Sequence, residues 1–180
     1  MRFESARAPT TPERENRREA LNAANLRWLL AERYAGRKAV VWAHNAHVMN
    51  AFYAPGFHKV RLAPRPGDMK PTGVFLKDSL GDEVYTLGMT TFEGREGLAT
   101  GGPISQIPPA PDGSLEARLH ALGWPYAFVD FRASRRDRSS PIRGPQTIRV
   151  PKFETSTVTD IARVYDGMFF IDRMSPATGL

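Results

Sequence analysis

The feature that most constrains the fold is a short apolar run, Lys38–Ala43, which directly follows a long helical pattern. Its β-branched and aromatic residues follow one another without alternating polar positions. Such a run is typical of a strand that is covered on both faces, as in parallel sheets. The run therefore predicts a buried strand early in the chain.

Helical and strand patterns alternate along the chain. A helix is predicted over residues 12–35, beginning near Thr10 and Glu13 and ending at Gly36. Further helices are predicted over 71–80, 114–122 and 160–165, and further strands over 83–89, 126–131 and 168–172. This order predicts one α/β domain over residues 1–180, with a mainly parallel sheet flanked by helices. Residues 94–113 and 132–153 are predicted to be long loops.

The composition excludes several classes of protein. Hydrophobic residues make up 41% of the chain and charged residues 24%, as in folded globular domains. No apolar stretch is long enough to span a membrane, and the N-terminus has no apolar signal region, so no membrane partner is expected. The absence of cysteine excludes a disulfide scaffold, a thiolate nucleophile and a Cys-ligated metal, and it fits a cytoplasmic location.

The net charge of +6 raises nucleic-acid binding as one alternative. Its main basic cluster has no interleaved aromatic residues that would stack on bases; it comprises Arg132, Arg135, Arg136, Arg138 and Arg143. A solvated loop explains this pattern better, so we do not expect a nucleic-acid partner.

The candidate site is the segment from Trp42 to His47, which ends the predicted first strand. Ligands of α/β sheets bind beyond the carboxyl ends of the strands. His44 can exchange a proton or polarise a carbonyl, and Asn45 can orient a ring or donate to an oxyanion. A helical turn would place His47 on the same face as His44. A backbone-capping role is the alternative for these histidines. Two ligands are too few for a zinc site, so neither a metal nor a cofactor is expected.

The other sequence motifs give little further information about function. The nucleophile elbow Gly-x-Ser-x-Gly and the common nucleotide-binding motifs are absent. Arg18 is either a cation in the crevice or a solvated helix residue. The loop after the histidines carries basic side chains that would form either a lid over a polar ligand or an exposed loop; these are His58, Lys59, Arg61 and Arg65.

The order of these motifs resembles the erythromycin esterase family. The resemblance covers about residues 14–174 and runs through Arg18-Glu-x-Leu21-x-x-x-Asn25-Leu26-x-Trp28, Trp42-Ala43-His44-Asn45-x-His47, Met69-x-x-x-Gly73, Gly81-Asp82-x-x-Tyr85 and Tyr165-Asp166-Gly-Met-Phe-Phe-Ile171-Asp172. It implies the α/β fold of that family and hydrolysis of a macrolide lactone by water that a histidine activates, hence antibiotic resistance. It also implies that His44 and His47 help to bind or polarise the lactone and to stabilise developing charge, while Arg18 lines the cleft. Asn45 is expected to bind substrate beside them.

The chain departs from the family pattern in two places. It has no Gly-Glu-x-x-His motif, which carries the base in the family, and Ala24 stands where a glutamate is common. The resemblance therefore implies the C-terminal part of a family domain, truncated at its N-terminus.

Three functions stay open at this point. The first is a hydrolase acting on a small-molecule ester or lactone, with His44 as the base if the chain acts alone. The second is a catalytically inactive ligand-binding module of the same fold, and the third is a basic nucleic-acid-binding protein. A bare sheet edge would favour either a homodimer or pairing with a missing N-terminal half.

Overall fold

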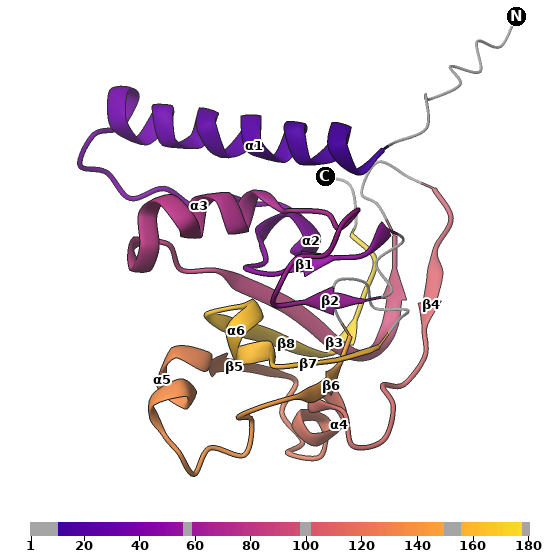
Figure 1. The fold of residues 1–180 in the computed structure, drawn as a ribbon. Coiled ribbons are helices and arrows are strands. Elements are labelled where there is room, and N and C mark those ends of the chain that lie inside the picture. Colours follow the sequence, from indigo (N-terminus) through magenta and orange to yellow (C-terminus); the bar gives the residue numbers. More distant parts are fainter. Residues whose placement is uncertain (1–10, 56–58, 98–101, 150–155, 178–180) are drawn as a thin grey trace, which may run out of the picture.

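The structure, a computed structural model, describes residues 11–55, 59–97, 102–149 and 156–177. Its first helix, α1 (Pro12–Trp28), continues into a π-helical turn, η1 (Leu29–Arg33), and lies along α3 (Thr72–Leu80). Figure 1 shows these two helices on one side of a central sheet. The predicted helix over 12–35 is thus confirmed in its main part.

Local signals explain how α1 begins. The Thr11 hydroxyl accepts a hydrogen bond from the Arg14 amide at 3.3 Å, and Pro12 occupies the first turn, where its missing N–H costs nothing. Only Glu19 and Ala23 are buried along the whole of α1. Its packing therefore depends on a narrow stripe that includes an acidic side chain.

The remaining elements are short. In chain order they are α2 (Asn45–Val48), β1 (Phe52–Tyr53), β2 (Val60–Arg61), the 3-10 turn η3 (Gly81–Glu83), β3 (Leu87–Glu96), β4 (Ser105–Ile107), α4 (Leu115–His120), β5 (Tyr126–Asp130), α5 (Phe131–Arg136), β6 (Gln146–Ile148), β7 (Thr157–Thr159), α6 (Ile161–Val164) and β8 (Gly167–Met174). Neither α1 nor any other helix of the described residues is long and apolar enough to cross a membrane.

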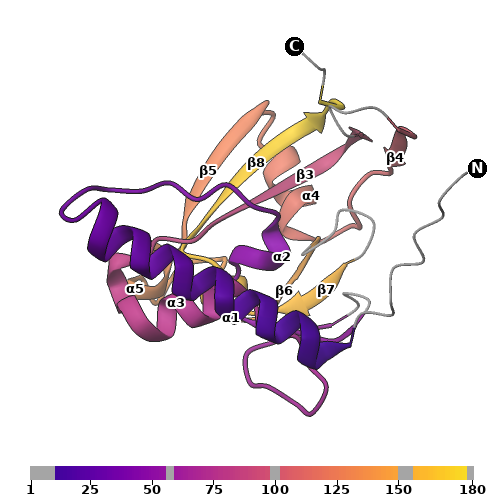
Figure 2. The same cartoon turned by 90° about the horizontal axis from the view of Figure 1, so that it is seen from above.

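The central sheet has four strands in the order β4-β3-β8-β5, seen from above in Figure 2. The β3–β8 pair is parallel, whereas β4–β3 and β5–β8 are antiparallel. The sheet is therefore mixed, and the prediction of a mainly parallel sheet requires correction. The end of β5 pairs with the start of β8, Asp130 opposite Gly167, so the connection between them returns along one end of the sheet. No crossover is needed, and the two strands run in opposite directions.

Both segments predicted to be long loops contain regular structure. The first, 94–113, includes the end of β3 and all of β4, which pair with each other. The second, 132–153, includes most of α5 and all of β6. Residues 98–101 and 150–153 within these ranges lie outside the described part of the chain.

The predicted strand at 38–43 is not formed. These residues have no regular secondary structure, and Val40 and Trp42 are 94% and 84% exposed. A continuous apolar run becomes a buried strand only where neighbouring strands and helices cover it. Within the described residues no strand pairs with this segment.

The core and one close helix contact fix the position of α2. Large buried side chains, including Met49, Phe131 and Tyr165, pack beneath it. The start of α3 touches the end of α2 so closely that a Cβ on Gly73 would lie 2.0 Å from the Val48 carbonyl oxygen. Only glycine allows this contact, which brings Thr72 close to the histidine segment.

Candidate active site

His44 caps the short helix α2. Its backbone is extended, and its Nδ1 accepts a hydrogen bond from the Ala46 amide at 3.1 Å. His47 lies one turn later, and the two imidazole rings are edge to face with centroids 6.5 Å apart. The structure thus brings the two predicted histidines together on one short helix, and it also gives His44 the capping contact that was the alternative interpretation.

Asn45 anchors α2 to the sheet. Its side-chain amide donates to the Met89 carbonyl oxygen at 2.7 Å, and its side-chain oxygen accepts from the Met89 amide at 3.0 Å. The buried Tyr165 hydroxyl donates to the backbone oxygen of Asn45 at 3.2 Å. Both polar atoms of the side chain predicted to bind substrate are therefore engaged with β3.

Glu19 of α1 is the acidic partner of His47. Its Oε1 lies 2.9 Å from His47 Nδ1, and its side chain is 2% exposed. Its Oε2 accepts hydrogen bonds from the Thr72 amide at 3.1 Å and from the Thr72 hydroxyl at 2.6 Å. The carboxylate is thus held between the start of α3 and a histidine of α2.

The surroundings of Glu19 keep it ionised. Burial alone would raise its pKa, but contacts with His47, Thr72 and Arg18 outweigh burial and lower the pKa to about 2. The nearby Tyr53 responds in the opposite sense: burial, followed by the negative charges of Glu19 and Glu15, raises its pKa to about 12. A fixed negative charge therefore lies beside the histidines at neutral pH.

Arg18 lies at the edge of this site. Its guanidinium pairs with Glu15 at 2.5 Å and with Glu19 at 3.1 Å, while its side chain is 53% exposed. The predicted cation is thus close to the histidine pair, balanced by two carboxylates and open to solvent.

In the basic loop after the histidines, Arg61 and Arg65 form contacts within the loop itself. Arg61 forms an ion pair with Asp68, which also accepts from the Arg65 amide at 2.9 Å. Asn16 of α1 binds the same loop through the Asp68 carbonyl oxygen at 3.1 Å. His58 lies outside the described residues.

Sequence reasoning missed Glu19 and Thr72. Glu19 stands in a run of charged residues that is typical of a solvated helix face, and Thr72 lies 53 positions later. The one available signal was position: Glu19 directly follows Arg18, in the part of the chain that carries the family resemblance.

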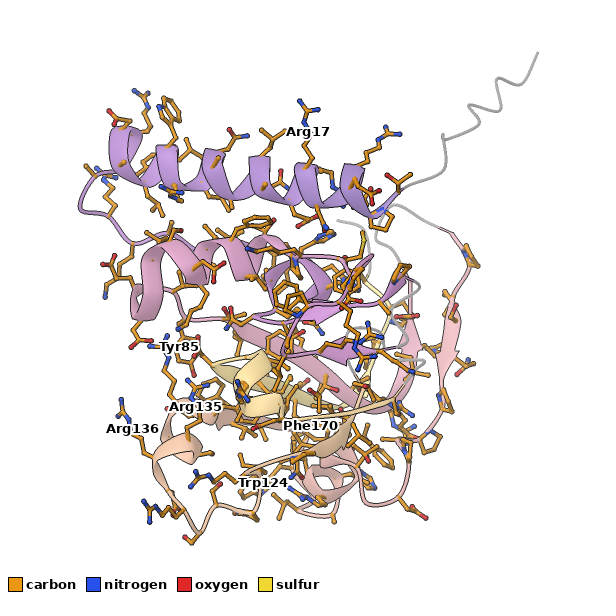
Figure 3. All side chains as sticks on the ribbon, viewed as in Figure 1. Arg17, Tyr85, Trp124, Arg135, Arg136 and Phe170 are labelled. Atoms are coloured by element: carbon orange, nitrogen blue, oxygen red, sulfur yellow. The ribbon has the colours of Figure 1, made fainter. Side chains whose placement is uncertain are left out.

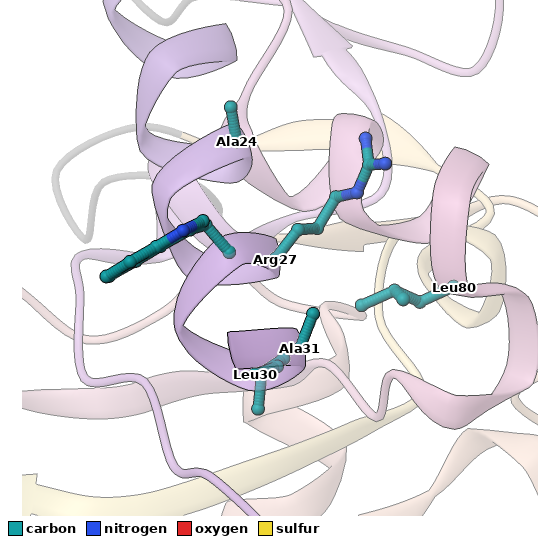
Figure 4. A pocket seen from close by; sticks show the side chains of 6 residues that line it. Ala24, Arg27, Leu30, Ala31 and Leu80 are labelled. Atoms are coloured by element: carbon teal, nitrogen blue, oxygen red, sulfur yellow. The ribbon is translucent and has the colours of Figure 1, made fainter. Parts of the chain in front are cut away.

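A groove elsewhere in the molecule is separate from this site. It has a volume of about 540 Å³ and lies between the end of α1, η1 and the end of α3, as Figure 4 shows. Its lining residues are Ala24, Arg27, Trp28, Leu30, Ala31 and Leu80. None of the predicted site residues lines it.

The basic cluster that raised nucleic-acid binding is partly neutralised. Arg132 and Arg135 both form ion pairs with the buried Asp166, at 3.0 and 2.8 Å. Figure 3 shows Arg136 pointing away from the body of the domain, whereas Arg135 points inward. Through these ion pairs Arg132 and Arg135 connect α5 to Asp166.

Among the described residues, no three His, Cys, Asp or Glu side chains are grouped as metal ligands. Glu19 and His47 are instead arranged as a carboxylate–imidazole pair.

Two curated relatives resemble this chain in sequence. The hydrolase-like protein YbfO of Bacillus subtilis (strain 168) is 26% identical over 166 residues, which is 89% of this chain and 35% of that protein. Erythromycin esterase type II of Escherichia coli is 26% identical over 162 residues, which is 85% of this chain and 36% of that protein. The chain therefore spans about a third of the length of the curated relatives it matches.

Two solved structures share the fold. A succinoglycan biosynthesis protein matches with a TM-score of 0.68 and 20% identity, over 92% of this chain and 40% of its own. A Bacillus cereus protein matches with a TM-score of 0.70 and 16% identity, over 96% of this chain and 42% of its own. The erythromycin esterase family model matches residues 2–174. With nearly the whole chain matched, this protein belongs to the erythromycin esterase family.

Proposed function

We propose that this chain provides the histidine site of an esterase that hydrolyses a macrolide lactone or a related carboxylic ester. The observation that carries this proposal is the His44–His47 pair on α2, with His47 2.9 Å from a buried, ionised glutamate. A carboxylate beside an imidazole is the arrangement by which many hydrolases prepare a base.

The proposed reaction is a direct attack of water on the ester. An imidazole removes one proton from water while the water oxygen bonds to the carbonyl carbon, giving a tetrahedral oxyanion. Collapse of this intermediate breaks the bond to the alcohol oxygen, which receives the proton from the imidazolium. The products are a carboxylic acid and an alcohol, and we expect Arg18 to contact polar oxygens of the substrate at the rim of the site.

The macrolide substrate is supported by the name of one relative, an erythromycin esterase. Under this proposal the physiological role is resistance to the antibiotic. The cytoplasmic location predicted from the cysteine-free composition belongs to the same proposal.

Mass spectrometry of erythromycin incubated with the purified chain tests the activity. We expect a product with one added water, and loss of this product in His44→Ala and in His47→Ala. His120→Ala is the matched control, because His120 also faces a carboxylate, Asp172 at 2.6 Å, but on α4. If the native chain gives no product, or if His47→Ala gives as much, the hydrolase proposal fails.

The second candidate is a binding module of the same fold that does not turn over its ligand. The absence of a Gly-Glu-x-x-His motif from the sequence favours it. Calorimetric titration with erythromycin distinguishes the two: heat of binding without any hydrolysed product supports the module, and hydrolysis excludes it.

An exposed apolar face supports a macromolecular partner. Leu87, Tyr126 and Phe128 lie on one face of the sheet and are 44%, 62% and 56% exposed. We propose that the remaining part of a family-length domain covers this face, since the chain spans 35–36% of its curated relatives. Sedimentation velocity with and without a separately expressed N-terminal part of such a relative tests this. A heterodimer supports the proposal, whereas a homodimer or an unchanged monomer contradicts it.

A further inference from the structure

The groove between the ends of α1 and α3 is a feature that the histidine site does not use (Figure 4). Hydrogen bonds from Thr72 to Glu19 hold the start of α3 against the middle of α1, and Ala23 is the last buried residue of α1. Beyond Ala23 the two helices leave the groove between them. Its volume of about 540 Å³ is within the range of small-molecule sites.

One face of α1 and η1 forms a wall of this groove. Ala24, Arg27, Trp28 and Ala31 line it, and their spacing of three, four and seven positions places them on one side of a helix. The two alanines leave space because their side chains are short. Trp28 adds an aromatic surface that is 60% exposed. An open apolar groove with an aromatic wall is typical of a binding site for an apolar group.

The same wall contains an irregular helical turn. In η1 the Tyr34 amide donates to the Leu29 carbonyl oxygen, five positions earlier, at 2.8 Å. Two residues of this π-helical turn, Leu30 and Ala31, line the groove. Such turns are rare and occur frequently at functional sites. The backbone geometry is therefore a second indication, independent of the volume, that the groove has a function.

Arg27 gives the groove a charge. Of the six described residues that line it, Arg27 alone is ionisable at neutral pH, and Figure 4 shows its side chain extending from α1 toward α3. No carboxylate of the described residues lies within ion-pair distance of its guanidinium, whereas Arg18 and Arg61 are paired with acidic residues. The guanidinium can therefore form a bidentate pair with the carboxylate of a ligand.

The sequence around the groove is also basic. Residues 27–38 contain four cationic side chains and one acidic side chain, which are Arg27, Arg33, Arg37, Lys38 and Glu32. On the opposite side, Asp82 after α3 is paired with Lys77 at 3.1 Å. An excess of positive charge attracts anions and repels cations. The groove therefore favours an anionic ligand over a cationic ligand of the same shape.

We propose that this groove binds a monomeric fatty acid, with the carboxylate paired to Arg27 and the alkyl chain lying between Trp28 and Leu80. Burial of the alkyl chain removes apolar surface from water, and the ion pair fixes the position of the head group. The proposal does not rest on the hydrolase function, because none of the histidine-site residues lines the groove.

Calorimetric titration with decanoate, below its critical micelle concentration, tests the proposal. We expect saturable binding of one decanoate per chain, and decylamine, a cation of the same chain length, should bind weaker by about tenfold or more. Arg27→Gln should weaken decanoate binding by a similar factor. Arg17→Gln is the matched control, because Arg17 is an exposed arginine of the same helix that points away from the domain in Figure 3.

Filling the groove tests its location. Ala31→Trp places a large side chain in the groove and should abolish decanoate binding. Asn22→Trp is the control, because it adds the same side chain at an exposed position of α1 outside the groove. Circular dichroism establishes that both variants are folded. Equal binding by Ala31→Trp and Asn22→Trp would place the ligand elsewhere and overturn the proposal.

Tryptophan fluorescence gives a readout within the groove itself. The chain has three tryptophans, so the double variant Trp42→Phe/Trp124→Phe leaves Trp28 as the reporter. Both replaced side chains are largely exposed, and the variant should fold normally. We expect decanoate to shift the Trp28 emission to shorter wavelength, because the alkyl chain displaces water from the indole ring. An unchanged emission at saturating decanoate contradicts the proposal.

A lipid surface is the competing occupant, and sedimentation with phosphatidylglycerol vesicles distinguishes it. Binding to these vesicles without binding of monomeric decanoate would overturn the fatty-acid site. Equal affinities for decanoate and decylamine, or for decanoate in the native chain and in Arg27→Gln, would also overturn it. The hydrolysis of erythromycin is measured separately, so a failure of the proposed hydrolase function leaves these outcomes decisive for the groove.

Discussion

Two glutamates of this protein are both buried, yet their pKa values shift in opposite directions. Glu19 and Glu116 are 1% and 0% exposed, and each accepts a hydrogen bond from a threonine hydroxyl at 2.6 Å, from Thr72 and Thr90 respectively. The pKa of Glu19 is lowered to about 2, whereas burial raises the pKa of Glu116. Low exposure and one hydroxyl contact therefore do not by themselves determine the direction in which the pKa of a carboxyl group shifts.

The difference comes from the balance of burial and contacts: burial dominates at Glu116, whereas contacts with His47, Thr72 and Arg18 outweigh it at Glu19. Glu19 has Arg18 and His47 within ion-pair distance. Glu116 accepts the backbone N–H of Arg149 at 3.0 Å, but the guanidinium of Arg149 is bound to the carbonyl oxygens of Phe92 and Pro109. Glu116 Oε2 has no hydrogen-bond partner in the described part of the chain. We infer that Glu19 is an ionised group serving a site, whereas Glu116 links β3, α4 and the end of β6 as a structural contact.

Acidification should have the largest effect on stability, through Glu19. Its pKa is 4.5 in the unfolded chain and about 2 in the folded one, a difference worth roughly 3 kcal/mol at neutral pH. Because the unfolded state binds the proton first, this stabilisation is present above the unfolded pKa and is lost as the pH falls toward the folded one. Urea unfolding from about pH 7 to about pH 3 measures it. Glu19→Gln should show a smaller loss, and equal losses would contradict the lowered pKa.

Gly73→Ala should have the next largest effect. The new methyl group would meet the Val48 carbonyl oxygen, so α3 must move and carry Thr72 away from Glu19. We expect a loss of about 2 to 3 kcal/mol in the free energy of unfolding, together with a loss of hydrolytic activity. Gly36→Ala is the control: its methyl group would meet no atom within 4 Å, and its positive φ of 73° should cost about 1 kcal/mol. Equal effects of the two changes would show that the close contact does not matter.

Glu19→Gln should destabilise the protein moderately at neutral pH. It keeps an acceptor for Thr72 but removes the negative charge next to Arg18 and His47. We expect a cost of about 1 to 2 kcal/mol, measured by urea unfolding. A stability equal to that of the native chain would mean that Glu19 gains nothing from its cationic neighbours.

Glu116→Gln should have the smallest effect. The glutamine oxygen can accept from Thr90 and from the Arg149 amide as before, so we expect a change within about 0.5 kcal/mol. A carboxyl group with a raised pKa stabilises the fold below its unfolded pKa and loses this contribution as the pH rises. The Tm of Glu116→Gln relative to the native chain should therefore increase as the pH rises above the unfolded pKa of 4.5. A constant difference in Tm contradicts the raised pKa.

The sequence was a good guide where structure depends on neighbouring residues. The helix of α1 and the strands at 126–130 and 167–174 follow from local patterns, and His44 and His47 were placed on one helical turn by their spacing alone. The mixed direction of the sheet was not predictable in this way, because it depends on how Asp130 comes to pair with Gly167 across 37 positions.

The prediction failed where an element depends on distant partners. The run 38–43 has the composition of a buried strand, but the described residues provide no strand to pair with it. Glu19 shows the reverse case. Its neighbours in sequence are charged, as on an exposed helix face, but its side chain is buried where it accepts hydrogen bonds from Thr72. A local sequence pattern reflects the intrinsic preference of a residue, whereas its burial depends on which distant residues pack against it.

The contact between Asn45 and β3 restricts substitutions at position 45 more than at position 89. Because Asn45 pairs with the backbone amide and carbonyl of Met89, the identity of the side chain at position 89 is irrelevant to this contact. Position 45 has no such freedom, since aspartate lacks the donor and glutamine is longer by one methylene. A change of side chain at position 89 can thus leave this contact intact, whereas a substitution at position 45 would release the histidines from the sheet.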